Sequence, residues 1–505
     1  MRRTIRGQSI LDHLAAHIPR DGGAGLDREG YQLPEAAEVV AGVRWAPGAL
    51  HGVLGHHTLV ENDSHHDAAR WVWLVRRTGS RWGGRRAVRA LLAELAATGG
   101  PDRSTREEVL ARLHDAGEDR AAAGVGRSLA YRGRERATVT FGIALIALDL
   151  TPDDLDRLLV LARHDDFTSA AIRTLLATTD SAEATLFAVA RVAAGWGRIA
   201  AVEALPHPPR PDIQRWLVCG GYEAIPFGYL LLDAAWNLRS LLQNVEPADE
   251  ELYRAAISLL HELISGFHNG MLPAGDIEEY EDAGWVLEKI LAWVATQPED
   301  VRFHQFLHEM QGWLTTDDPD DPERGAAAKT IRADHPELLR LLDDLLSRTD
   351  WATLAMLVLA DPSHPHFLQA ERIAALYGSD TFSVLLVKID HDQDTTAFSL
   401  AARTAGPVRI DEVVDRALQH LGADDSAAHA VVSRLADFPG VGWPLISRVA
   451  SSRWRGYRLD ALRTLGRWHP PTLPPEVVAR LEELHGQECD AEVREQIRAL
   501  LAEDV

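Results

Sequence analysis

Apolar residues recur at helical spacing through most of this chain, and the pattern is clearest between residues 182 and 221. Apolar positions three and four residues apart lie on one face of an α-helix. The pattern predicts one helix before the elbow Gly195-Trp196-Gly197-Arg198 and another after it, with a third helix starting behind Pro211-Asp212 and stopping at Gly220-Gly221. We therefore predict that Trp196 is a buried wedge between hairpins and that Gly197 holds a backbone conformation closed to other residues.

The same spacing predicts helices along the rest of the chain, for example over 35–42, 224–243 and 250–265. Residues 383–389 are rich in branched side chains typical of strands, but their neighbours are helical, so we expect a helix there as well. The joins are short, which makes consecutive helices antiparallel hairpins. The sequence thus predicts an all-α fold, a right-handed superhelical α-solenoid of stacked hairpins, on the order of a dozen in number.

Breaks in the helical pattern suggest how the chain is divided. Glycine and proline interrupt residues 19–34, so we expect 1–34 to be an N-terminal helix followed by a mobile linker. Residues 35–316 form a first helical array in this interpretation, and 324–505 form a second one. Between them, residues 317–323 read Asp-Asp-Pro-Asp-Asp-Pro-Glu, which we interpret as an acidic loop or domain seam.

Two short segments carry a family resemblance. The segment Asp490-Ala491-Glu492-Val493-Arg494 resembles the Asp-x-x-Val-Arg turn of HEAT repeats, and residues 456–462 are similar to it. Around the elbow, the motif at 195–198 together with Val202-Glu203 and Arg215-Trp216-Leu217 resembles bacterial helical-repeat proteins that carry the label limonene hydroxylase. That label implies monoterpene oxidation, but the sequence offers no haem-thiolate loop, no flavin fingerprint on a strand and no iron triad, so the activity is not carried over.

The charge of the chain is strongly acidic and unevenly distributed. The net charge is −23, which argues against a protein that coats duplex DNA. Residues 1–136 hold 21 arginines and 17 acids, a net of +4, so the remainder carries a net of −27. We therefore hypothesise a non-catalytic scaffold that binds a basic protein or peptide along an acidic concave face. The proposed partner-binding residues are Glu278, Glu279, Glu281, Asp282, Trp236 and Trp285.

An arginine-rich segment supports an alternative. Seven arginines and no acid lie between Arg70 and Arg89, interleaved with three tryptophans. Guanidinium groups bind phosphates and indoles stack on bases, so the chain could be a nucleic-acid-binding or DNA-repair protein resembling the helical-repeat DNA glycosylases. The residues concerned are Arg76, Arg77, Arg81, Arg85 and Arg86. We favour two ordinary helices with tryptophan in the core and arginine outside.

A third alternative is a metal-dependent enzyme. Five histidines crowd beside carboxylates near the N-terminus, a combination that can hold zinc or iron. They are His51, His56, His57, His65 and His66. Their spacing matches no standard metal signature, and His304 with His308 lacks a third ligand, so we interpret that pair as an exposed polar stripe.

Other chemistry finds no support in the sequence. Residues 195–200 match the letters of a dinucleotide fingerprint, but a helix precedes them where a strand is needed. We therefore expect no cofactor and no catalytic residues. Cys219 and Cys489 lie far apart, and we find neither a signal peptide nor a membrane-spanning segment, so we expect a cytoplasmic protein without a membrane partner.

Overall fold

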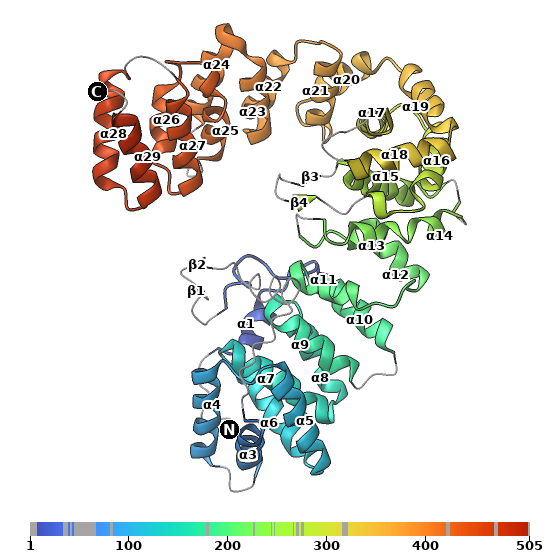
Figure 1. Ribbon diagram of the computed structural model, residues 1–505, viewed down its shortest axis with the longest axis vertical. Helices are drawn as coiled ribbons and strands as arrows, with labels where there is room; N and C mark the ends of the chain where they lie inside the picture. The colour runs from blue at the N-terminus through green and yellow to red at the C-terminus, as the bar shows by residue number, and fades with distance from the viewer. Residues whose placement is uncertain are drawn as a thin grey trace. The chain divides into compact units, whose positions relative to one another are not determined.

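The computed structural model confirms the all-α fold. It describes residues 8–33, 39–40, 43–44, 67–80, 84–177, 181–225, 228–243, 245–246, 248–265, 267–268, 272–273, 277–315, 322–420, 425–468 and 473–502. Helices dominate these residues (Figure 1). Within them, no helix combines the length and the apolar character needed to cross a membrane.

Two short antiparallel strand pairs interrupt the helical pattern. Strand β1 (Val39–Val40) pairs with β2 (Val43–Arg44), and β3 (Phe267–His268) pairs with β4 (Leu272–Pro273). The first pair shows that the helix expected over 35–42 is wrong at its C-terminal end. Valine is stiff at its branched Cβ, so it favours extended backbone where no helical neighbours support it.

The chain divides into two compact units. Unit 1 comprises Met1–Trp293 and Gly312–Leu338, and unit 2 comprises Val294–Gln311 and Leu339–Val505. Most of the acidic seam expected at 317–323 lies outside the described residues, and helix α18 (Pro322–Asp334) begins at its end. The domain boundaries derived from the sequence stay a prediction.

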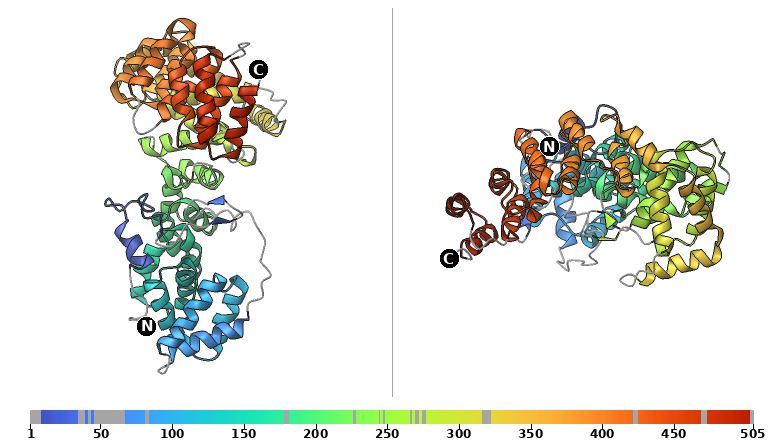
Figure 2. Two further views of the ribbon diagram at one scale, coloured as in Figure 1. Left: turned by 90° about the vertical axis from the view of Figure 1, so that its left-hand side faces the viewer. Right: turned by 90° about the horizontal axis from the view of Figure 1, so that it is seen from above.

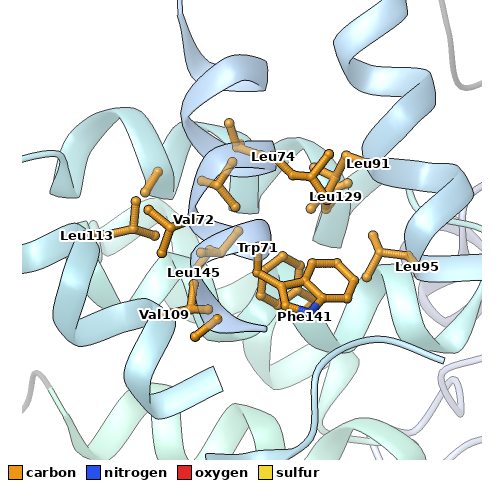
Figure 3. Packing of buried hydrophobic residues seen from close by; sticks show 14 residues of the cluster. Trp71, Val72, Leu74, Leu91, Leu95, Val109, Leu113, Leu129, Phe141 and Leu145 are labelled. Carbon is orange, nitrogen blue, oxygen red and sulfur yellow. The ribbon is translucent and has the colours of Figure 1, made fainter. Parts of the chain in front are cut away.

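Unit 1 begins with α1 (Ile10–Ala16), α3 (Ala68–Gly79), α4 (Arg85–Thr98), α5 (Arg103–Asp115), α6 (Asp119–Arg132), α7 (Arg136–Ile146), a 3₁₀ turn (Ala147–Asp149), α8 (Pro152–Leu161) and α9 (Asp165–Leu176). The helices from α3 to α7 enclose a large apolar cluster. The ring centres of Trp71 and Phe141 lie 5.3 Å apart in this cluster, and Figure 3 shows the two side chains together. Helices α6 and α7 approach closely, because a Cβ at Gly142 would lie 2.4 Å from the backbone nitrogen of Ala130.

The remaining helices of unit 1 follow the elbow. They are α10 (Ala182–Val192), α11 (Gly195–Glu203), α12 (Pro211–Trp216), a wide turn (Leu217–Gly221), α13 (Leu231–Ala235), α14 (Leu238–Gln243), α15 (Glu250–Ser265), a 3₁₀ turn (Ile277–Glu279), α16 (Ala283–Val294) and α18. The three helices expected around the elbow are confirmed. The single helix expected over 224–243 is wrong: Gly228 has a φ of +66°, and the side chain of Asn237 donates to the carbonyl of Asp233 (2.7 Å).

Unit 2 contains helical hairpins. Its helices are α17 (Val301–Thr315) and α19 (Glu337–Ser347), apart from the few end residues that belong to unit 1, then α20 (Trp351–Leu359), α21 (Phe367–Leu376), α22 (Phe382–Asp392), α23 (Thr395–Thr404), α24 (Gly406–Gln419), α25 (Ser426–Val432), a 3₁₀ turn (Leu435–Asp437), α26 (Trp443–Ala450), α27 (Arg455–Gly466), α28 (Pro475–Gln487) and α29 (Ala491–Ala502). The helix expected over 383–389 is confirmed as part of α22.

Neighbouring hairpins of unit 2 pack through every second helix. Helices α23, α25, α27 and α29 contact one another in turn. They lie side by side in the C-terminal stretch that is coloured orange to red in Figures 1 and 2. Arg458 joins the last two hairpins, because its guanidinium makes two hydrogen bonds to the carboxylate of Glu488 (2.9 and 3.1 Å). Asp490 accepts from the backbone of Val493 and caps α29. The Asp-x-x-Val-Arg segment therefore lies at a helix start.

Candidate functional site

The N-terminal segment lies against the elbow. Arg163 donates to the carbonyl oxygens of Gly23 (2.7 Å) and Gly25 (3.0 Å), and the backbone nitrogen of Gly25 donates to the carbonyl of Val192 (2.8 Å). The fully buried imidazole of His164 lies 3.3 Å from the carbonyl of Tyr31. Residues 19–33, which the sequence marks as a mobile linker, therefore bond to helix α10 and to the residues that lead into α9.

The elbow itself is built from two glycines with different roles. Gly195 has a φ of +57°, a backbone conformation that favours glycine. Gly197 has no such backbone; a Cβ there would lie 2.3 Å from Oγ1 of Thr168 on α9. This corrects our expectation, since Gly197 is required for the close approach of two helices. Trp196 also differs from the expected buried wedge: it is half-buried, and its ring meets the ring of Tyr229 edge-on at 5.1 Å.

The carboxyl group of Asp165, on helix α9, contacts the elbow. Asp165 accepts a hydrogen bond from the backbone nitrogen of Gly197 (3.2 Å) at the start of α11. Burial, opposed by the Gly197 amide and reinforced by neighbouring Asp166, raises the pKa of Asp165 to about 7. Asp166 is itself held by Arg136 (2.6 Å). The elbow thus contains a carboxyl group that titrates near neutral pH.

Arg198, the last residue of the elbow motif, binds backbone carbonyls. Its guanidinium donates to the carbonyls of Ala193 (3.2 Å) and Glu223 (3.0 Å). These two oxygens belong to the end of α10 and to the loop before α13. Arg198 is accordingly a clamp that holds the turns around the elbow together.

An exposed aromatic side chain of unit 1 contacts a histidine that lies close to a carboxylate. Trp236 is 47% exposed, and its ring meets the ring of His207 edge-on at 5.7 Å. His207 Nε2 lies 3.5 Å from the carboxylate of Asp233. Glu203 is exposed as a residue, but partial covering of its carboxyl group and then the charge of Asp233 raise its pKa. We call Glu203, His207, Asp233 and Trp236 the Trp236 face.

The other predicted partner-binding acids lie in different surroundings. Asp282 pairs with Arg239, and the guanidinium of Arg239 lies 5.3 Å from the ring centre of the half-buried Trp285. Glu279 and Glu281 are exposed, while the side chain of Glu278 lies outside the described residues.

The acids near residue 250 are bound by arginines. Arg215 makes ion pairs with both Asp249 and Glu251, each at 2.6 Å, and Arg254 pairs with Glu250 (2.5 Å). Asp249, Glu250 and Glu251 are therefore each paired with an arginine, while the acids at 317–321 lie outside the described residues. An ion pair with a guanidinium neutralises the charge of a carboxylate, so the paired carboxylate attracts a cationic partner only weakly.

The arginine-rich segment divides between core and surface. Trp71 is buried, as expected, but Trp73 is 52% exposed and carries the guanidinium of Arg77 at 4.9 Å from its ring centre. This corrects the expectation that the tryptophans of this segment lie in the core; Trp82 lies outside the described residues. Arg76 pairs with Glu118 (2.8 Å), Arg85 and Arg86 are exposed at the start of α4, and Arg81 lies outside the described residues.

The histidines give no metal centre among the residues that the structure describes. The predicted candidates His51, His56, His57, His65 and His66 lie outside them. Within the described ranges, no group of three or more histidine, cysteine, aspartate or glutamate side chains is arranged to hold a metal ion. His304 is buried, which corrects its assignment to an exposed stripe; its Nε2 lies 3.2 Å from the hydroxyl of Tyr377.

The Trp236 face was only partly accessible to sequence reasoning. Trp236 belonged to the predicted set, but Glu203, His207 and Asp233 come from separate segments, and no spacing in the sequence links them. In comparisons with known proteins, no family model, curated protein or solved structure matches this chain. The resemblances to HEAT repeats and to the proteins labelled limonene hydroxylase stay predictions.

Proposed function

We propose that this chain is a HEAT-like helical-repeat scaffold that binds a basic segment of a protein partner through the Trp236 face. The observation that carries the proposal is the half-exposed indole of Trp236 against the ring of His207, which lies 3.5 Å from the carboxylate of Asp233, while the charge of Asp233 also acts on Glu203. Consecutive hairpins that pack through every second helix support the solenoid part of the proposal. In a solenoid, such a face would lie along an extended binding surface.

The chemistry of this face favours a cation. Burial and then the charge of Asp233 raise the pKa of Glu203 in the free protein, and a lysine or arginine side chain placed near these two acids would offset the second of these effects. The indole of Trp236 can accept the same cation on its ring, a contact worth about 0.5–2 kcal/mol. Exposed Glu279 and Glu281 would add long-range attraction, which acts mainly on the association rate.

The test uses peptides of defined sequence. A random 12-residue peptide library is selected on the full chain and counter-selected on the Trp236→Ala variant. We expect lysine- and arginine-rich sequences, and we expect Trp236→Ala or Asp233→Asn to weaken their binding about tenfold. Glu281→Gln is the matched control, because it removes an exposed charge that is not part of the Trp236 face and should change affinity less than twofold.

Two outcomes would contradict this proposal. The selected peptides could lack basic residues, or they could bind Trp236→Ala and wild type equally. Equal weakening by Glu281→Gln and Asp233→Asn would show that only the overall negative charge attracts the peptide. Circular dichroism and thermal unfolding of each variant exclude loss of fold as the cause.

One observation favours a second candidate function, the binding of single-stranded nucleic acid. Exposed Trp73 under the Arg77 guanidinium offers a ring for base stacking, and Arg85 and Arg86 lie exposed on the next helix. Fluorescence anisotropy with labelled single-stranded DNA and RNA tests it. Binding that weakens in Trp73→Ala and falls steeply with salt supports this candidate; no binding at low salt excludes it.

A further inference from the structure

Unit 2 contains an open cavity of about 370 Å³. The sequence did not predict this cavity, and the proposed function does not involve it. It lies between helices α17 and α19 and the end of α21, and we call it the Tyr377 cavity. Its lining residues are His308, Gln311, Asp343, Leu346, Ser347 and Tyr377. Tyr377 and Leu346 supply the apolar part of this lining, and His308, Gln311, Asp343 and Ser347 supply polar groups.

Tyr377 forms a fixed wall of this cavity. Its hydroxyl group is bonded to His304, which is buried, so the exposed half of the side chain is mainly ring. Trp351 holds His304 from another side, edge-on at 5.0 Å, and the indole of Trp351 is anchored by a hydrogen bond to the carbonyl of Leu346 (2.8 Å). Burial and then His308 lower the pKa of His304 to about 4, which leaves it neutral near pH 7.

Two neighbouring aspartates on α19 differ in their partners. Asp344 forms an ion pair with Arg340 (3.0 Å). Asp343 lines the cavity and accepts from the neutral side-chain amide of Gln311 (2.5 Å). In the part of the chain that the structure describes, no arginine or lysine pairs with Asp343. The negative charge of Asp343 is therefore not neutralised by a cationic side chain of the described residues.

We propose that the Tyr377 cavity binds a primary alkylammonium group, with the ammonium on the carboxylate of Asp343 and the carbon chain against the ring of Tyr377. An ammonium has three donors and no acceptor. The carboxylate of Asp343, the amide oxygen of Gln311 and the hydroxyl of Ser347 are acceptors among the lining groups. Ser347 donates to the carbonyl of Asp344 (3.2 Å), which leaves its lone pairs free to accept. The aromatic ring adds a cation–π contribution.

Two sources can supply this group, a free polyamine or the lysine side chain of a peptide. The inference is independent of the Trp236 face, because it uses residues of unit 2 alone. Its failure would leave the proposed function unaffected, and the Trp236→Ala variant should keep full affinity for the ligand of the cavity.

The test measures binding of small probes to the full chain by isothermal calorimetry. The probes are spermidine, a blocked lysine (Nα-acetyl-lysine methylamide) and the same lysine acetylated at Nε, which removes the charge. We expect the blocked lysine or spermidine to bind at millimolar concentration or below and the acetylated lysine to bind at least about tenfold more weakly. A preference between the first two identifies the source of the group.

Matched variants locate the site. Asp343→Asn should weaken binding about tenfold, whereas Asp344→Asn, the same change at the next residue, should alter it less than twofold. Tyr377→Leu should also weaken binding because it removes the ring. Ser347→Lys, which brings an ammonium of the protein into the cavity, is a second test that does not depend on the folding of the Asp343 variant, and it should abolish binding.

Four results would overturn the inference. The first is that neither spermidine nor the blocked lysine binds at millimolar concentration. The second is that the acetylated lysine binds as well as the charged one. Asp343→Asn and Asp344→Asn could weaken binding equally, which would indicate general attraction to an acidic surface. Finally, acetate or inorganic phosphate could bind in place of the amines, which would assign the cavity to an anion held by His308.

Discussion

Replacing Gly197 by alanine tests the packing of the elbow. The new methyl carbon would lie 2.3 Å from Oγ1, 3.0 Å from Cβ and 3.1 Å from Cγ2 of Thr168. Carbon atoms in contact prefer about 3.5–4.0 Å, so the helices must separate or Thr168 must move. Thr168 is fully buried, and its hydroxyl bonds to the carbonyls of Ala162 (2.9 Å) and His164 (3.1 Å), so it cannot rotate without losing them.

The expected cost follows from these contacts. Overpacking of a buried contact costs about 1–3 kcal/mol, and a weakened hydrogen bond of Thr168 adds about 0.5–1.5 kcal/mol. Alanine is favoured over glycine inside a helix by about 0.5–1 kcal/mol, which offsets part of this. We therefore expect Gly197→Ala to reduce local stability by about 1–3 kcal/mol. Gly124→Ala on α6 is the matched control, because no atom lies within 4 Å of its new Cβ.

Native-state hydrogen exchange read by mass spectrometry is the suitable assay, since a chain of two units need not unfold in one step. Peptides from α9 and α11 should exchange faster in Gly197→Ala and at the wild-type rate in Gly124→Ala. Thr168→Ala removes two of the three overlapping atoms, so the double variant should lose less stability than the sum of the single variants. Unchanged exchange in Gly197→Ala, or strict additivity with Thr168→Ala, would refute the packing argument.

Three further predictions concern single side chains. The fold raises the pKa of Asp165 from 3.8 to about 7, so ionisation of Asp165 lowers the stability of the wild type as pH rises from about 4 to 7. Asp165→Asn has no charge to form. Its stability relative to wild type should therefore increase over this pH range and stay higher above pH 7. The shift corresponds to about 4 kcal/mol at most, and partial exposure reduces the gain to about 1–2 kcal/mol, measured as thermal midpoints at pH 5 and pH 8. Arg458→Ala should destabilise α27–α29 by about 1–3 kcal/mol, because Glu488 loses two hydrogen bonds in a largely buried pair; equal exchange in these helices would contradict it. Trp236→Ala should leave the melting temperature within about 2 °C, because the indole is half exposed; a large drop would assign Trp236 to the core.

The helical pattern predicted most elements because apolar spacing depends on the chain alone. It identified α10, α11 and α12 around the elbow and the helix that contains Ser383–Ile389. It failed at 224–243, where the positive φ of Gly228 precedes the first helix and the side chain of Asn237 bonds to the backbone between α13 and α14. The spacing of apolar residues does not indicate where a side chain competes for backbone hydrogen bonds.

The roles of individual residues depended on distant contacts that the sequence does not contain. A glycine in an elbow motif suggests unusual backbone, yet only the position of Thr168 shows that Gly197 is needed for space, while Gly195 has the positive φ. His304 and His308 stand one helical turn apart in the sequence, but α20 and the end of α21 bury the first and leave the second exposed. Tertiary neighbours decide these cases.

The distribution of arginines determines where an acidic chain can attract a cation. The sequence carries a net charge of −27 beyond residue 136, and this count placed a partner at the richest acidic runs. Arg215, Arg239 and Arg254 neutralise acids in those runs. A carboxylate bound by a guanidinium must give up that pair before it can bind a ligand, so its net gain is small. Asp233, near the imidazole of His207, and Asp343, which accepts from the neutral amide of Gln311, are not paired with a guanidinium in the part of the chain that the structure describes. They do not have this cost, which favours these two clusters over the long acidic runs as candidates for cation binding.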